Sequence, residues 1–171
     1  MTIRASSPLN ELRLVTMTKK QPSNIKIITK NKKAFFQYHI DEKFEAGISL
    51  IGSEVKSLRE GRANLVDSYG LIKAGELFLL HAHIAQYQPA GQFNHEPRRT
   101  RKLLVHRKEL QKIEWKLKQK GLTLIPTMLY FKKGKAKVEI ALAHGKKKYD
   151  KREAIKKRET KRALGKAMRR R

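Results

Sequence analysis

The last 27 residues of the chain carry too much charge and too few apolar side chains to help build a folded core. Residues 145–171 contain fourteen lysines and arginines against Asp150, Glu153 and Glu159, a net charge of +11. A segment of this composition cannot offset the entropy lost on ordering. It is therefore expected to be disordered when free and to order against a polyanion. The folded domain must be built from the residues before it.

The rest of the chain is basic as well. The 171 residues hold 41 Lys and Arg against 15 Asp and Glu, and residues 1–144 keep a net charge of +15. Such a balance favours a nucleic-acid partner over an anionic membrane surface. The absence of cysteine excludes disulfides and cysteine-based zinc sites. No segment has the apolar length of a membrane span or the apolar centre of a secretion signal, so a cytoplasmic protein without a membrane partner is expected.

Short segments with a period of two dominate the middle of the chain. Phe36, Tyr38 and Ile40 share one side of a strand predicted from residue 34, which continues at 46–51 after a bend near 41–43. Further strands are predicted at residues 65–72, 76–85, 122–131 and 136–143, the last two forming a hairpin around 132–135. Pro126 has no N–H to donate, so its strand should lie at an edge or carry a bulge.

Two helices with recognisable ends are expected among these strands. In residues 52–61, Ser53 can cap the first turn and Gly61 can adopt the left-handed conformation that ends a helix. A second, amphipathic helix is predicted from about residue 106 to 120, where Gly121 stops it. Its core face carries Leu110, Ile113 and Leu117.

This succession predicts a mainly β fold. Six or so short strands and two helices, without a βαβ rhythm, favour a small closed antiparallel barrel, with an open α+β sheet as the alternative. The expected domains are a disordered N-terminal extension (1–24), an RNA-binding barrel (25–144) and a basic C-terminal tail (145–171) that becomes helical on its target.

No catalytic, metal or cofactor site is predicted. His81 and His83 lie two apart in a strand and could share a ligand face, but no third ligand has convincing spacing. The carboxylates are scattered, and neither a nucleophile elbow nor a glycine-rich phosphate loop occurs. His39 or His144 could act as a ribonuclease base, but a lone histidine has no specificity as a signal. The chain is therefore not expected to be an enzyme.

Two basic groups are candidates for phosphate contacts, because guanidinium and ammonium groups match phosphate. The first lies in a predicted loop and comprises Arg98, Arg99, Arg101 and Lys102. The second extends the positive surface from the hairpin and comprises Lys132, Lys133, Lys135 and Lys137. A solvated run of charges is the alternative interpretation. Glu45 can accept hydrogen bonds from bases or pair with a nearby lysine.

The tail contains one aromatic residue, Tyr149. Amid lysines it suits stacking on an unpaired base, although packing against the body is equally compatible with its spacing. The few apolar residues of the tail form no continuous stripe, which argues against a helix lying on a membrane.

Five ordered motifs resemble the SsrA-binding protein family, also called small protein B. They are Asn31-Lys-Lys-Ala, Glu45-Ala-Gly-Ile, Gly52-x-Glu-Val-Lys-Ser-Leu-Arg59, Arg101-Lys-Leu-Leu104 and Gly145-Lys-Lys-x-Tyr-Asp-Lys-Arg152. The resemblance runs from about Asn31 to the C-terminus.

The resemblance implies an oligonucleotide-binding-type barrel with two or three flanking helices, acting as a monomer bound to transfer-messenger RNA. In that family the barrel binds the tRNA-like domain of the RNA and delivers it to stalled ribosomes. The tail enters the vacant decoding site and message channel, where it contacts small-subunit ribosomal RNA and replaces codon–anticodon pairing. The nascent chain then receives a degradation tag. A ribosomal or ribosome-assembly protein whose tail threads through ribosomal RNA is the alternative, and an RNA-processing enzyme is a third.

The family motifs also imply site residues. The body positions are Asn31, Glu45, Leu104 and Lys137, with Leu104 expected to support the RNA-binding surface from below. The decoding-centre positions are Gly145, Lys146, Lys147, Tyr149, Asp150, Lys151 and Arg152. Ile155 and Met168 are expected to help dock the tail helix. Phe36 and Ser53 depart from residues that some relatives carry and are not expected to be contacts, and residues 1–30 lie outside the match.

Overall fold

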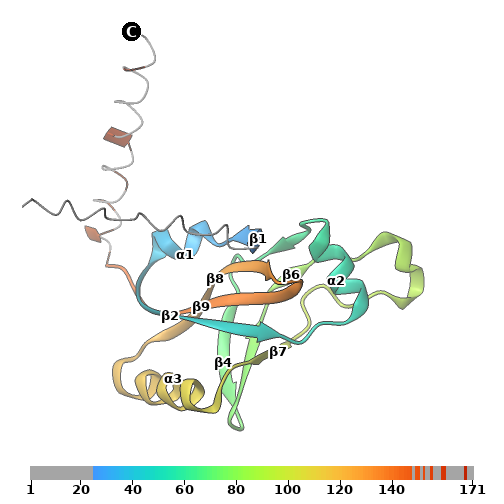
Figure 1. The fold of residues 1–171 in the computed structure, drawn as a ribbon. Coiled ribbons are helices and arrows are strands. Elements are labelled where there is room, and N and C mark those ends of the chain that lie inside the picture. The colour runs from blue at the N-terminus through green and yellow to red at the C-terminus, as the bar shows by residue number, and fades with distance from the viewer. Residues whose placement is uncertain are drawn as a thin grey trace, which may run out of the picture.

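The computed structural model describes residues 25–147, 149–150, 152, 155, 159–160 and 168 (Figure 1). The predicted N-terminal extension and Lys151 lie outside the described residues. The strands are β1 (Ile25–Lys30), β2 (Tyr38–Ile48), β3 (Ala63–Asn64), β4 (Tyr69–Lys73), β5 (Glu76–Leu80), β6 (His83–Ile84), β7 (Arg101–Leu104), β8 (Thr123–Lys132) and β9 (Lys135–Gly145). The helices are α1 (Lys32–Gln37), α2 (Gly52–Arg59) and α3 (Arg107–Lys120), with a 3₁₀ helix η1 (Gln88–Phe93).

Seven strands form an antiparallel sheet that closes on itself. Its order is β1-β8-β4-β5-β7-β2-β9, and β9 pairs back with β8, so six strands make a ring to which β1 is added. The separate β3–β6 pair lies outside this sheet. The prediction of a mainly β, closed antiparallel barrel with flanking helices is confirmed. Closure pairs the strand edges with one another and leaves loops and strand ends for binding.

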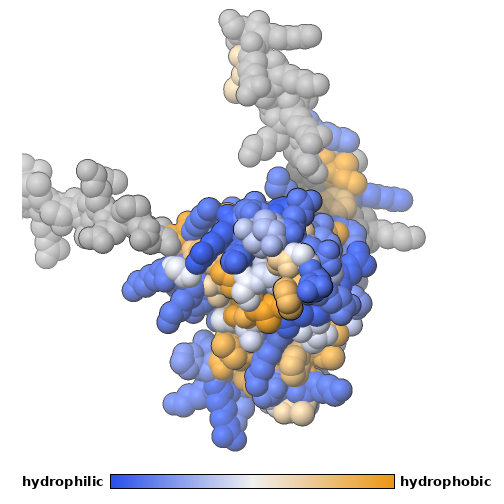
Figure 2. Space-filling model, turned by 90° about the vertical axis from the view of Figure 1, so that its right-hand side faces the viewer, coloured by the Kyte–Doolittle hydropathy of each residue, from blue (hydrophilic) through white to orange (hydrophobic). Residues whose placement is uncertain are grey.

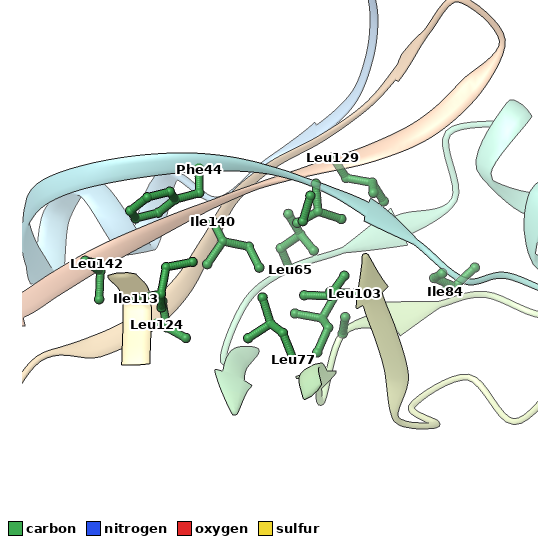
Figure 3. Close-up of a cluster of buried hydrophobic side chains, with 14 of the residues drawn as sticks. Phe44, Leu65, Leu77, Ile84, Leu103, Ile113, Leu124, Leu129, Ile140 and Leu142 are labelled. Carbon is green, nitrogen blue, oxygen red and sulfur yellow. The ribbon is translucent and has the colours of Figure 1, made fainter. Parts of the chain in front are cut away.

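The core fills the ring with mostly aliphatic side chains from facing strands, together with Phe44 (Figure 3). Leu77, Leu103 and Ile140 come from three different strands and are at most 2% exposed. Helix α3 adds Ile113, which is fully buried, with Leu110 and Leu117 packed beside it as the helical spacing predicted. Replacing any one of these leucines or isoleucines by alanine would cost roughly 2–5 kcal/mol of folding free energy.

The strand predicted from residue 34 is wrong at its start, because residues 32–37 form helix α1. The alternating pattern did not reveal the cap: the Asn31 Oδ1 accepts a hydrogen bond from the Ala34 N–H at 3.0 Å and begins the helix. Strand β2 then follows without interruption to Ile48. The predicted bend is a β-bulge in this strand, where the pairing with β9 shifts between Ile40 and Glu42.

Two other predicted strands are also interrupted. The segment predicted as one strand over 65–72 contains a turn after β3, in which Asp67 has a φ of +60°, before β4 begins. His81 has a φ of +57° and ends β5, so His81 and His83 do not share a strand face as expected. The predicted loop at 86–97 contains η1.

The predicted helix ends and the hairpin agree better with the structure. Gly61 and Gly121 both adopt positive φ beyond α2 and α3, at +76° and +56°. The strands β8 and β9 pair as a hairpin, with a register shift just after Pro126. Ser53 does not cap α2, however, because its hydroxyl lies 3.0 Å from the His95 Nδ1.

Candidate nucleic-acid interface

Glu45 lies at the centre of a charged cluster on β2, β8 and β9. Its carboxylate accepts hydrogen bonds from the Tyr130 hydroxyl at 2.6 Å and from the Lys132 ammonium at 2.8 Å, and the Lys137 ammonium lies 3.1 Å away. The Lys132 and Tyr130 hydrogen bonds lower the pKa of Glu45 to about 2. Burial, and then the hydrogen bond to Glu45, raise the pKa of Tyr130. Of the two interpretations of Glu45, pairing with lysine is the one that the structure contains.

A groove with an apolar floor lies beside this cluster. It has a volume of about 500 Å³, and its lining includes Gly47, Leu104 and Phe131, with Lys135 and Lys137 at its wall. Leu104 pairs with Gly47 across β7 and β2 and is 55% exposed. The expectation that Leu104 supports the surface from below is therefore wrong, because its side chain forms part of the surface. An apolar floor with cationic walls suits an unpaired base and its phosphate.

Some large hydrophobic side chains are exposed within a largely polar surface. On the face drawn in Figure 2, hydrophobic side chains lie together near the middle and hydrophilic ones surround them. Around the groove, Lys133 on the turn after β8 and Lys135 at the start of β9 are exposed, as predicted. Arg98 is exposed as well, and no carboxylate of the described residues lies within ion-pair distance of it.

The neighbouring Arg99 and Arg101 form ion pairs with a buried carboxylate instead. Glu54 of α2 is completely buried, and it accepts hydrogen bonds from the Arg99 Nε at 2.8 Å, the Arg101 Nε at 2.8 Å and the Ile51 N–H at 3.0 Å. Burial alone would raise the pKa of Glu54. The hydrogen bonds from Arg99 and Ile51 and the charge of Arg101 outweigh this and hold that pKa below its ordinary value.

Arg101 has no exposed surface, so the expectation that it contacts RNA phosphate is wrong. Its guanidinium also donates to the carbonyls of Ala82 at 2.5 Å and Pro97 at 3.0 Å, which ties the segment before β7 to the barrel. Two nitrogens of the Arg99 guanidinium donate hydrogen bonds, one to each carboxylate oxygen of Glu54, and the Arg99 side chain is partly exposed. Lys102 forms a surface ion pair with Glu76.

Asn31 is likewise a structural residue in this fold. It is only 3% exposed. Besides capping α1, its amide donates to the Leu65 carbonyl at 2.9 Å and to the Pro126 carbonyl at 3.1 Å. It therefore joins α1 to the turn after β3 and to β8. Within the body that the resemblance assigns it to, Asn31 is buried, and almost none of its side chain reaches the surface.

The start of the tail is held to the barrel by strand pairing and hydrogen bonds. Gly145 is the last residue of β9 and pairs with Tyr38 of β2. The Lys146 N–H donates to the Gln37 carbonyl at 2.9 Å, and its ammonium reaches the Phe35 carbonyl at 3.0 Å. The first residues of the predicted tail thus belong to the barrel.

From Tyr149 on, the described tail residues have helical backbone and exposed side chains. The Lys147 N–H donates to the Asp150 carboxylate at 3.1 Å. Tyr149 and Met168 are each 75% exposed and Ile155 is 42% exposed, and Arg152 is exposed too. Tyr149 does not pack against the body in this structure. Its ring is open to a stacking partner.

Two groups of interacting polar residues were not predicted from the sequence. The Glu54–Arg101 pair joins residues 47 positions apart, and His39, Asp41 and His144 come together from β2 and β9. Neither group has a local sequence signal, because each depends on which strands and helices become neighbours.

Comparison with known proteins identifies the family. The family model described as "SmpB protein" matches residues 28–170, which includes the barrel and nearly all of the tail. The chain belongs to the SmpB protein family. The resemblance noted from the five motifs is thereby confirmed. Among the described helices, none combines the length and the apolar character needed to cross a membrane.

Individual SmpB relatives match most of the chain. The SsrA-binding protein of Trichodesmium erythraeum is 56% identical over 153 residues, 89% of this chain and 98% of that protein. The SsrA-binding protein of Sulfurihydrogenibium sp. is 58% identical over 142 residues, 83% of this chain and 93% of that protein. A chain of the solved structure described as "tmRNA-SmpB: a journey to the center of the bacterial ribosome" is 44% identical. It superimposes with a TM-score of 0.61, covering 74% of this chain and 93% of that one.

Proposed function

We propose that this chain is an RNA-binding factor of trans-translation that acts as two modules. The barrel binds the tRNA-like domain of transfer-messenger RNA, and the tail occupies the vacant decoding site and message channel of a stalled ribosome. The protein binds and positions RNA rather than catalysing a reaction. The nascent chain is then tagged and the ribosome released.

The observation that carries this proposal is the length of the family match. It extends over residues 28–170, so barrel and tail are both parts of one SmpB protein rather than a barrel with an unrelated extension. The structure adds a physical basis for their joint action. The tail starts from a strand of the barrel, so an RNA bound to the barrel has a defined position relative to the beginning of the tail.

The groove beside Leu104 is the proposed RNA-binding site of the body. Its exposed apolar floor can take an unpaired base, and Lys135 stands beside it to meet a phosphate. Glu45 holds Lys137 at the groove and Lys132 in the adjoining charged cluster through its ion pairs. Glu45 thus acts on RNA through the lysines that it orients. Recognition by shape and backbone, with selectivity at unpaired nucleotides, is the common mode of structured-RNA binding.

The body's role is tested by a matched pair of leucine variants. Leu104→Ala removes exposed apolar surface in the groove, whereas the control Leu71→Ala removes a comparably exposed leucine on β4 (43%). Burying a leucine against a base contributes about 1.5 kcal/mol or more, so Leu104→Ala should weaken binding of the isolated tRNA-like domain about tenfold. Leu71→Ala should leave the affinity unchanged. Equal effects of the two variants would contradict the assignment of the groove.

The choice of RNA is tested by competition. Labelled tRNA-like domain bound to the full chain is challenged with unlabelled copies of itself or with fragments of ribosomal RNA, at several salt concentrations. Both RNAs should show a steep salt dependence, because phosphate contacts release counterions. Only the tRNA-like domain should compete at stoichiometric amounts. Equal competition by ribosomal RNA would instead support the ribosomal or assembly protein.

The tail's role is tested at Tyr149. Its exposed ring is proposed to stack on a ribosomal RNA base in the decoding centre, with Gly145, Lys146, Lys147, Asp150, Lys151 and Arg152 serving the same site and Ile155 and Met168 docking the tail helix. Tyr149→Ala should impair tagging far more than RNA binding, whereas Tyr149→Phe keeps the ring and should preserve tagging. If both variants tagged normally, the ring would have no part in decoding-centre binding.

A further inference from the structure

His39, Asp41 and His144 bring three metal-ligating side chains together on the outside of the barrel. Within the residues that the structure describes, they form a group of candidate ligand atoms that all lie within 4.8 Å of one another. His39 and His144 are direct partners in the β2–β9 pairing, so their side chains leave the sheet on the same face. Their rings stack with centroids 4.9 Å apart.

The β-bulge supplies the third group. The pairing between β2 and β9 shifts between Ile40 and Glu42, and Asp41 is the extra residue. Its carboxylate contacts both imidazoles, with one oxygen 3.4 Å from the His39 Nδ1 and the other 3.4 Å from the His144 Nδ1. All three side chains keep more than a third of their surface exposed, so an ion can reach them.

We propose that His39, Asp41 and His144 form a binding site for a divalent transition-metal ion, Zn²⁺ in particular. Ligand atoms that surround a tetrahedral zinc ion at about 2.1 Å lie roughly 3.4 Å from one another. Each imidazole Nδ1 lies at this separation from one of the two Asp41 oxygens. Rotation of these exposed side chains about their own bonds, without movement of the strands, would bring two nitrogens and one oxygen around the ion. Two imidazoles and one carboxylate leave a fourth position for water or an oxygen ligand from solution.

The ligand set also decides between metals. Imidazole nitrogen is a good ligand for zinc and its neighbours in the transition series, whereas Mg²⁺ and Ca²⁺ require several oxygen ligands. One carboxylate is too few for these two ions in a chain of net charge +26. The other nearby acid, Glu42, is already paired with Lys112 and Lys116. The site should therefore select Zn²⁺ over Mg²⁺ even when Mg²⁺ is abundant.

An ion at this position would join β2 to β9 at the end of the barrel from which the tail emerges. His144 is followed directly by Gly145, and the Lys146 N–H bonds to the Gln37 carbonyl two residues before His39. Metal binding should consequently slow the opening of this strand end. The inference concerns the bare protein and does not depend on which RNA the chain binds.

The test uses the untagged full chain, freed of RNA and metal, and titrated with Zn²⁺ in competition with a chromogenic chelator. One ion per chain should bind. His39→Ala and His144→Ala should each weaken binding by at least about tenfold, since even the loss of a residue that only orients a ligand has an effect of that size. Asp41→Asn, which changes the shape of the site least, should weaken binding as well. Mg²⁺ in excess should not displace Zn²⁺.

Two control variants locate the binding. His106→Ala removes an exposed histidine at the start of α3, and His81→Ala removes an exposed histidine of the His81–His83 pair. Neither should change the affinity for Zn²⁺. A second readout is hydrogen exchange at the Lys146 amide, which Zn²⁺ should slow in the native chain and not in His39→Ala. Zinc binding that survives His39→Ala and His144→Ala, or that vanishes in His81→Ala, would overturn the proposal, as would the absence of binding.

Discussion

Replacing Glu54 by glutamine should destabilise the barrel severely while leaving its RNA surface intact. Glu54 and Arg101 are both completely buried, and the carboxylate is the countercharge for Arg101 as well as Arg99. In Glu54→Gln the shape of the side chain is kept, but its charge is lost. The new NH₂ group also turns a donor toward guanidinium groups that can only donate.

The expected magnitude follows from the burial of the pair. Removing one partner of a buried ion pair leaves an uncompensated charge in the interior and costs about 3–5 kcal/mol of unfolding free energy. For a domain of this size the thermal midpoint should fall by roughly 10 °C. The control Glu76→Gln breaks the exposed pair with Lys102, whose side chains are each 45% exposed, and should cost less than about 1 kcal/mol.

Chemical denaturation at several pH values measures both variants. The pKa of Glu54 is lower in the folded chain than its ordinary value of 4.5. Its ionised form therefore stabilises the fold above pH 4.5, and this contribution is lost as the pH falls through the folded-state pKa. Glu54→Gln should flatten that acid slope. A Glu54→Gln protein as stable as Glu76→Gln, or one that stays stable but loses RNA affinity, would refute the structural role of this network.

Three further substitutions test the fold at single contacts. Gly70→Ala should cost about 1–3 kcal/mol of unfolding free energy by overpacking, because the added Cβ would lie 2.8 Å from a side chain of β8. In the control Gly52→Ala the added Cβ meets nothing within 4 Å, so thermal unfolding should show a loss of stability only for Gly70→Ala. Asn31→Ala should cost roughly 2 kcal/mol through the lost cap and the loss of two buried hydrogen bonds from the amide, without weakening RNA binding by the folded chain, which a binding titration below the midpoint checks. Tyr130→Phe should raise the pKa of Glu45 from about 2, because one of its hydrogen-bond donors is lost; a carboxyl NMR titration measures this, and an unchanged pKa would contradict the geometry.

Local sequence patterns predicted much of the barrel because its strands and helix ends obey local rules. Pro126 has no N–H to donate, so an irregularity in its strand was predicted, and the β8–β9 pairing shifts register just after it. Gly61 and Gly121 end their helices because only glycine adopts positive φ at little cost. The fold class followed from the rhythm of these elements.

Several of the errors arise from contacts between distant parts of the chain. Helix α1 begins at the local cap of Asn31, but the amide of this side chain is also held by carbonyls 34 and 95 positions away. Arg101 looked like one more member of a basic run, yet Glu54 draws it into the interior. A charge run and a buried ion pair have the same local sequence. The partner that distinguishes them is visible only in the fold.

The division into barrel and tail is tested most directly by a chain that ends after Lys147. This cut keeps β9 and the hydrogen bond from the Lys146 N–H to Gln37, so the barrel retains its strand pairing. Binding of the tRNA-like domain should be measured at a salt concentration that suppresses non-specific attraction to the tail, beside tagging on stalled ribosomes. We expect the shortened chain to bind the RNA as tightly as the full chain and to support no tagging. Loss of RNA binding, or normal tagging without the tail, would contradict the two-module account.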